Sequence, residues 1–153
     1  MKVAFLGDGH LSQTLADAAA IKGFEIMHNA IADLVFVAPD VEDHSNLSEV
    51  DRYMVEALRY SAEQPVVLVS QVPPGYTRKW AKHRKNIYYQ VDTIIMSKAL
   101  ERMLQPERII IGTDGSEVAK SYMDYLYMFN CPRLVMSYES AELCKLAINY
   151  YLT

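Results

Sequence analysis

Two glycines near the start of the chain, Gly7 and Gly9, have the spacing of a phosphate-binding turn. They follow the apolar run at 3–6 and precede a segment at 11–21 whose apolar residues recur at helical spacing. A strand, a glycine turn and a helix in this order suit a dinucleotide, because glycines let its pyrophosphate approach the bare backbone. The pattern therefore predicts cofactor contacts at Gly7 and Gly9.

The helix after this turn is predicted to complete an anion site. The amides of His10 and Leu11 belong to its first turn, where no preceding carbonyl can pair with them. We expect these amides to face a cleft at the carboxyl end of the first strand. The alternative is a turn that is merely tight, because Ser12 stands at the third position of G-x-G-x-x-G, where glycine or alanine is usual.

The segment that should bind a ribose departs from the usual pattern. A second strand at 25–28 leads to Asn29, where this fold normally has a carboxylate. Asn29 can still hydrogen-bond a ribose hydroxyl, but without the charge that strengthens the usual contact. Only residues 29–33 separate this strand from the next, at 34–38, which is too few for a crossover helix between parallel neighbours. The second-strand region is therefore truncated, with its strand either displaced to a sheet edge or paired antiparallel in a hairpin.

The order of apolar segments predicts an α/β fold. Short runs that are apolar throughout are typical of strands buried on both faces of a parallel sheet, and amphipathic segments with helical spacing lie between them. This alternation predicts one Rossmann-like, doubly wound domain with a mostly parallel sheet at 1–137, followed by a terminal helix at 138–153. The apolar runs lie at 34–38, 66–69, 109–111 and 134–136, and the amphipathic segments at 47–58 and 118–129.

Composition excludes several classes of function. The chain has 153 residues, of which 51% are hydrophobic and 22% charged, as in one folded domain. Its formal net charge of −4 argues against nucleic-acid binding, which needs cationic surface. No apolar run approaches the roughly 20 residues of a membrane span, and no signal-peptide pattern is present, so we expect a cytoplasmic protein with no membrane partner. The 2 cysteines and 4 histidines have no metal-ligand spacing, so no metal site is expected.

Five short motifs, taken in order, resemble the UDP-glucose/GDP-mannose dehydrogenase family. They are the strand and glycine turn at 2–12, ADLVFVA at 32–38, VLVSQVPPG at 67–75, the segment from Ala99 to the glycine of PERIIIG at 112, and SAELCK with Asn149 at 140–149. The chain is similar to that family's N-terminal NAD-binding domain, in shortened form. The resemblance implies NAD as cofactor, with binding that is weak or lost, and contacts to it from Ala38, Ser70 and Gln71. A threonine stands in the family where Gln71 stands here.

The same resemblance implies catalytic residues. The family's active-site lysine and asparagine, which stabilise oxyanion character and hold water, correspond to Lys145 and Asn149. Their i, i+4 spacing places both on one helix face, so they can converge on one ligand. Asp92 corresponds to a glutamate of the family; the alternative is an ordinary carboxylate at a strand end. The family's catalytic cysteine belongs to a later domain, and neither Cys131 nor Cys144 matches its motif.

Three functions remain open at this point. The first is an NAD-linked nucleotide-sugar oxidoreductase that needs a separate chain for its thiol and substrate pocket. The second is a nucleotide binder without catalysis, and the third is an interaction module that keeps the fold. The ligand of the first two is NAD or a nucleotide sugar. We also expect a homodimer through the terminal helix, roughly 138–152, because apolar and tyrosine side chains lie around more than one of its faces.

Overall fold

One mixed sheet organises the chain in the computed structural model, which describes residues 1–59, 62–92 and 96–152. Within these ranges seven strands follow the order β2-β1-β3-β4-β5-β6-β7. Neighbouring strands run parallel except for β5 and β6, which are antiparallel, so the mostly parallel sheet is confirmed. The strands are β1 (Lys2–Leu6), β2 (Glu25–Met27), β3 (Leu34–Val37), β4 (Val66–Leu68), β5 (Ile87–Val91), β6 (Ile109–Thr113) and β7 (Arg133–Ser137).

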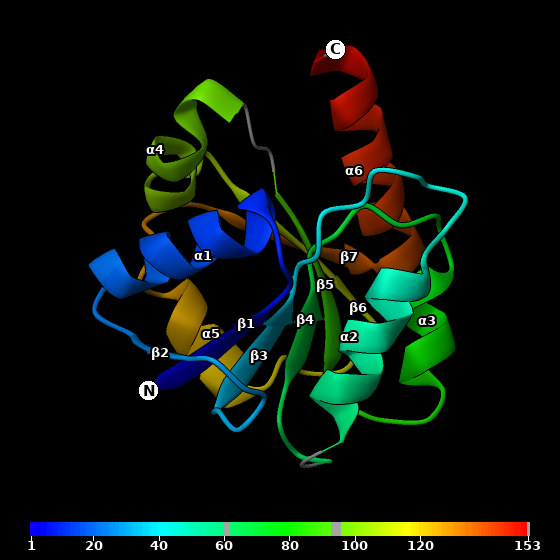
Figure 1. Cartoon of the computed structure of the whole chain (residues 1–153), viewed down its shortest axis with the longest axis horizontal. Coiled ribbons are helices and arrows are strands. Elements are labelled where there is room, and N and C mark those ends of the chain that lie inside the picture. The colour runs from blue at the N-terminus through cyan, green and yellow to red at the C-terminus, as the bar shows by residue number, and fades with distance from the viewer. Residues whose placement is uncertain (60–61, 93–95, 153) are drawn as a thin grey trace.

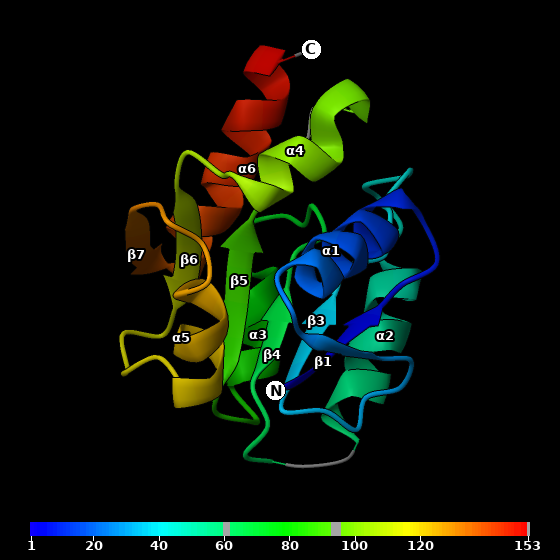
Figure 2. The ribbon, with the colours of Figure 1, turned by 90° about the vertical axis from the view of Figure 1, so that its left-hand side faces the viewer.

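Helices cover both faces of this sheet, as in a doubly wound fold (Figure 1). One face carries α1 (His10–Ile21), α4 (Ala99–Leu104) and α5 (Lys120–Leu126), which lie in front of the sheet in Figure 2. The other face carries α2 (Ser48–Leu58), α3 (Tyr76–Ala81) and α6 (Tyr138–Leu152). A short 3-10 turn, η1 (Met96–Lys98), leads into α4. The helix expected at the end of the chain is therefore present as α6.

The central strands are apolar throughout because each packs against two helical layers. In β3, Val35 and Val37 belong to the core under α2, α3 and α6, whereas Leu34 and Phe36 belong to the core under α1 and α5. The Phe36 ring stacks on Phe5 with centroids 5.1 Å apart. Successive strand residues point to opposite faces, so a strand buried on both sides cannot alternate with polar residues.

The second strand lies at the edge of the sheet, and the antiparallel alternative is wrong. Glu25–Met27 pairs parallel with Lys2–Ala4, on the side of β1 away from β3. The chain then returns across the sheet without a helix. Ala30, in that return, is fully buried in the core shared with α2, and its carbonyl accepts a hydrogen bond of 2.7 Å from the Gln64 side chain. A short extended loop thus replaces the usual crossover helix.

Two strands differ from the sequence expectation. The segment Ile87–Val91 is fully buried as β5, although its tyrosines and Gln90 interrupt any apolar run. The Gln90 side chain accepts a 2.6 Å hydrogen bond from the Tyr122 hydroxyl, which removes the cost of burying it. Conversely, β7 lies at the other sheet edge and exposes Leu134 and Val135, so the expectation that it is buried on both faces is wrong.

Candidate functional site

The glycine turn lies at the carboxyl end of β1, next to the end of β3. Gly7 has a φ of 150°, a conformation that favours glycine. A Cβ at this position would come within 2.7 Å of the Ala38 carbonyl oxygen. Ala38 is buried, and its amide donates a 2.8 Å hydrogen bond to the Leu6 carbonyl. Gly7 is therefore required by the close approach of two backbone segments of the protein itself.

The first amides of α1 are covered by a carboxylate of the protein. The His10 amide donates to Asp40 Oδ2 at 2.8 Å, and the Leu11 amide donates to Asp40 Oδ1 at 3.0 Å. The expectation that these amides face an open cleft is thus wrong. Asp40 follows β3, which pairs with β1, so the sheet brings its carboxylate to the positive end of the α1 dipole.

A second carboxylate flanks the same turn. Asp8 is exposed, and its Oδ1 accepts a 2.9 Å hydrogen bond from the Tyr53 hydroxyl on α2. The Ser12 hydroxyl donates to the Gly7 carbonyl at 2.9 Å, which closes the turn from within. The turn as described is therefore acidic and internally hydrogen-bonded.

The proposed ribose contact, Asn29, lies beyond the end of β2 on the exposed surface. Its Oδ1 accepts a 3.0 Å hydrogen bond from the Ile31 amide, which makes a local Asx turn. Asn29 thus lies just beyond β2, the neighbour of β1, where dinucleotide-binding folds have their ribose contact. Its side-chain oxygen, however, already accepts the hydrogen bond that shapes the loop to β3.

The residues after β4 connect the turn to the terminal helix. The Ser70 hydroxyl, which is buried, donates to the Pro39 carbonyl and so holds the segment that carries Asp40. Next to it, Gln71 accepts a hydrogen bond from the Asn149 side-chain amide on α6. Ser70 is an internal support, whereas Gln71 faces the predicted catalytic helix.

Lys145, also on α6, meets Asp92 at the end of β5. The Lys145 side chain is only 7% exposed, and its Nζ donates to the Asp92 main-chain carbonyl. Burial lowers the pKa of Lys145, and the Asp92 charge partly opposes that shift. Burial raises the pKa of Asp92, partly offset by Lys145, and Asp92 Oδ2 is buried with no hydrogen-bond partner among the described residues. The structure thus brings Lys145 and Asn149 together with Asp92 and Gln71.

One polar residue of this region was missed by the sequence analysis. Glu142 is fully buried on α6, and its carboxylate accepts hydrogen bonds from the Gly75 and Thr77 amides, each at 2.9 Å. Burial raises the pKa of Glu142, and these hydrogen bonds partly oppose the shift. The sequence did hold a signal, because Glu142 is an acid within the apolar stretch of the terminal helix. A glutamate is almost never fully buried unless it is paired, so its position there indicated a hydrogen-bonded partner.

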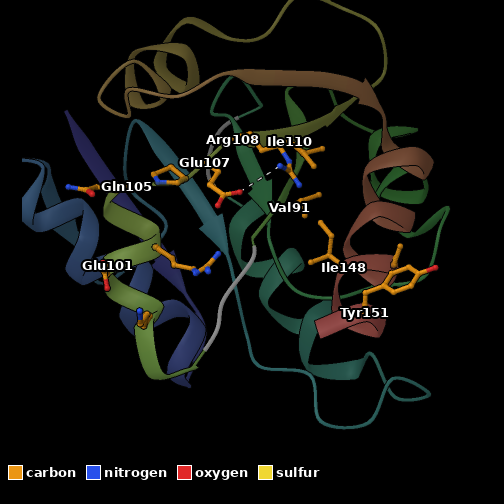
Figure 3. Close-up of a pocket in the computed structure, with 12 residues that line it drawn as sticks. Val91, Glu101, Gln105, Glu107, Arg108, Ile110, Ile148 and Tyr151 are labelled. Atoms are coloured by element: carbon orange, nitrogen blue, oxygen red, sulfur yellow. Dashed lines mark ion pairs between the residues drawn. The ribbon is translucent and has the colours of Figure 1, made fainter. Parts of the chain in front are cut away.

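A cavity of about 510 Å³ lies between α4 and α6, a size typical of small-molecule sites (Figure 3). Glu101 on α4 and Gln105, which follows α4, stand opposite Ile148 and Tyr151 on α6. The charged side chains that line the cavity also include Lys98, Arg102, Glu107 and Arg108. Glu107 and Arg108 form an ion pair at 3.9 Å. Ile148, which lines this cavity, lies three positions from Lys145 and is therefore its neighbour on α6.

The described residues hold neither a membrane-spanning helix nor a metal-ligand cluster. No described helix combines the length and the hydropathy needed to cross a membrane. Within the described ranges, no three His, Cys, Asp or Glu side chains gather as a set of metal ligands.

The chain is similar in sequence and in structure to known dehydrogenases. No family model matches the chain. It is 30% identical over 123 residues to a UDP-glucose 6-dehydrogenase of Streptococcus pneumoniae, a match that covers 70% of this chain and 31% of that protein. A UDP-glucose dehydrogenase structure from Pyrobaculum islandicum superposes with a TM-score of 0.83 at 20% identity, covering 99% of this chain and 49% of that one. A GDP-mannose dehydrogenase from Pseudomonas aeruginosa gives 0.81 at 14% identity, covering 99% and 50%.

The fold and the site together define a Rossmann-like α/β domain of the kind that stands at the N-terminus of dehydrogenases. The chain belongs to the UDP-glucose/GDP-mannose dehydrogenase family. It spans about half the length of the two solved relatives and 31% of the S. pneumoniae protein.

Proposed function

We propose that the chain is an NAD-binding domain of the nucleotide-sugar dehydrogenase type, with weak affinity for the cofactor and no turnover by itself. The observation that carries the proposal is the convergence of Lys145 and Asn149 with Asp92 and Gln71 at the carboxyl ends of β4 and β5. Ligands of open α/β sheets bind at this edge, outside the carboxyl ends of the strands.

The proposed cofactor would lie along the same edge. Gly7 and Gly9 with the His10 and Leu11 amides would face its pyrophosphate, and Asn29 its ribose. Ala38, Ser70 and Gln71 would line its path toward α6. The residues of the turn do not fit a pyrophosphate in the conformation described, because Asp40 already accepts from both amides. Weak binding follows, since a dinucleotide must first displace this carboxylate.

The polar groups of α6 can serve a bound substrate only if they change partners. A buried ammonium and an amide on one helix face suit an oxyanion or a water molecule. At present Lys145 donates to the Asp92 carbonyl and Asn149 to Gln71. We propose Lys145, Asn149 and Asp92 as the catalytic set of an assembled enzyme, with the nucleotide sugar as substrate.

The cysteines support the absence of stand-alone turnover. The family's route, as the resemblance implies it, oxidises a sugar alcohol through a covalent thiol intermediate, which needs an activated thiolate. Burial raises the pKa of Cys131, which opposes thiolate formation. Cys144 packs with its Sγ 3.9 Å from the Met136 sulfur, on the core side of α6. Neither thiol is placed as a nucleophile.

Two measurements test this proposal. Purified protein mixed with NAD and UDP-glucose should form no NADH, and calorimetry with NAD should give an affinity weaker than micromolar. NADH formation at an enzyme-like rate without any added chain would contradict the first part, and sub-micromolar NAD binding the second.

A second function is favoured by the exposed apolar and aromatic side chains of α6. Leu143 is 57% exposed, Tyr150 79% and Tyr151 84%, and the two tyrosine rings meet edge to face at 5.6 Å. Exposed apolar and aromatic side chains gathered on one helix are typical of an interaction surface. We propose that α6 forms a homodimer interface, which would also suit a non-catalytic interaction module.

A further inference from the structure

We infer that Asp40 determines which ligands the glycine turn accepts. Its carboxylate is an internal anion that occupies the first turn of α1 and keeps phosphate groups off it. The inference rests on the proposed function in one respect, namely that this turn is the nucleotide site. It adds a residue, Asp40, that neither the dinucleotide motif nor the resemblance identifies.

The geometry of the contact is that of an anion bound by a helix. The two carboxylate oxygens divide the two amides between them, Oδ2 with His10 at 2.8 Å and Oδ1 with Leu11 at 3.0 Å. α1 is 12 residues long, so its dipole is developed at this end. These amides are the donors that a pyrophosphate would use, and the carboxylate and the phosphate therefore compete for them.

The backbone is built around this carboxylate. The φ of Gly9 is 169°, an extended value open to any residue, so conformation alone does not explain the glycine. A Cβ at Gly9 would lie 2.4 Å from Asp40 Oδ2. On the other side, the Pro39 carbonyl is held by the Ser70 hydroxyl. Gly9 thus makes room for Asp40, and the segment before Asp40 is anchored so that its side chain reaches the helix.

The surrounding charge acts in the same direction. Asp8 adds a second carboxylate on the turn, and none of the ion pairs in the described ranges includes Asp8 or Asp40. A pyrophosphate would therefore meet two carboxylates that form no ion pair within the described ranges. Asp40 is exposed, so its side chain can turn into solvent, which makes binding weak but still possible.

The test is calorimetric titration of the full chain with NAD and, separately, with adenosine, which has no phosphate. The variants are Asp40→Asn and Asp40→Ser, which remove the charge but keep an oxygen acceptor for the helix. The matched control is Asp33→Asn: Asp33 is also exposed and accepts a backbone hydrogen bond, from the Lys2 amide at 2.8 Å, but at the opposite end of β1. Circular dichroism establishes that each variant is folded.

We expect both Asp40 variants to bind NAD tighter than the parent by a factor of about ten to one hundred, the range for a hydrogen bond to a charged group. Adenosine affinity should stay the same, and Asp33→Asn should change neither. Equal NAD affinity of the parent and the Asp40 variants would overturn the inference and leave the proposed function standing. An equal gain for adenosine, or the same gain from Asp33→Asn, would also overturn it. Absence of NAD binding to every variant at millimolar concentration would contradict both.

Discussion

The buried carboxylate of Glu142 accepts hydrogen bonds from both the amide and the hydroxyl of Thr77, at 2.9 and 2.8 Å. A third bond, 2.9 Å long, comes from the amide of Gly75. Glu142 belongs to the SAELCK motif on α6 and Gly75 ends the VLVSQVPPG motif before α3, so one carboxylate joins two of the motifs that carry the family resemblance. α6 also holds Lys145 and Asn149, and its anchorage on α3 therefore positions both.

Replacing Glu142 by glutamine should destabilise the fold. Glutamine keeps one acceptor oxygen but turns an NH₂ group toward backbone amides that then lack a partner. We expect Glu142→Gln to lower the free energy of unfolding by about 1–3 kcal/mol, the cost of leaving a buried donor unsatisfied. Urea denaturation measures this. Glu139→Gln is the control, because Glu139 forms a half-exposed ion pair with Arg78, and such pairs contribute at most about 1 kcal/mol.

Asp92 and Lys145 should behave as a coupled pair. Either Asp92→Asn or Lys145→Met leaves the other charge buried without its partner, at a cost of about 3 kcal/mol. The double variant should cost clearly less than the sum of the two, since no charge then remains to be compensated. A double-mutant cycle by chemical denaturation gives the coupling energy. Additive effects would show that the two charges do not interact.

The stability contributed by Glu142 should fall as the pH rises. Burial raises its pKa above the ordinary value of 4.5, so the folded state binds the proton more tightly than the unfolded chain. Its contribution is therefore greatest below the unfolded pKa and declines as the pH passes through the folded one. The stability difference between the parent and Glu142→Gln should therefore decrease as the pH rises above 4.5, the ordinary pKa of the group. Glu139→Gln should show the reverse trend, because Arg78 holds the pKa of Glu139 below its ordinary value.

Alanine should be far less tolerated at Gly7 than at Gly23. Both have positive φ, 150° and 95°, but a Cβ at Gly23 meets no atom within 4 Å, whereas one at Gly7 meets the Ala38 carbonyl oxygen at 2.7 Å. We expect a loss of about 1 kcal/mol for Gly23→Ala and about 2–4 kcal/mol for Gly7→Ala, where backbone strain and a steric clash add. Thermal unfolding of the two variants compares them directly, and equal losses would contradict the close approach of β1 and β3.

The proposed dimer through α6 can be tested at Tyr151. Light scattering of the parent across micromolar concentrations should show a dimer, and Tyr151→Glu should shift it toward the monomer, because a charge at a buried interface is unfavourable. Tyr127→Glu provides a control. Tyr127 is exposed as well, at 62%, but it follows α5 on the other face of the sheet. A parent that remains monomeric at every concentration would show that α6 is no such interface.

Local pattern in the sequence was sufficient for much of the fold. Apolar runs predicted β3, β4 and β6, and helical spacing predicted α1, α2 and α6. These elements bury their own apolar side chains, so the spacing of apolar residues in the sequence marks where each strand or helix lies. The strand β5 left no such trace, because its tyrosines and Gln90 are buried only through partners elsewhere, such as Tyr122.

The character of the glycine turn was decided by tertiary structure alone. The sequence determined that a strand, two glycines and a helix follow one another, and this order is common to a nucleotide site and to a closed turn. What distinguishes them is Asp40, 30 residues from His10 in the chain, whose position depends on the pairing of β3 with β1. The edge position of β2 depends in the same way on its pairing with β1. Contacts between distant residues form only once the sheet has assembled, so no local pattern records which anion lies at the start of α1.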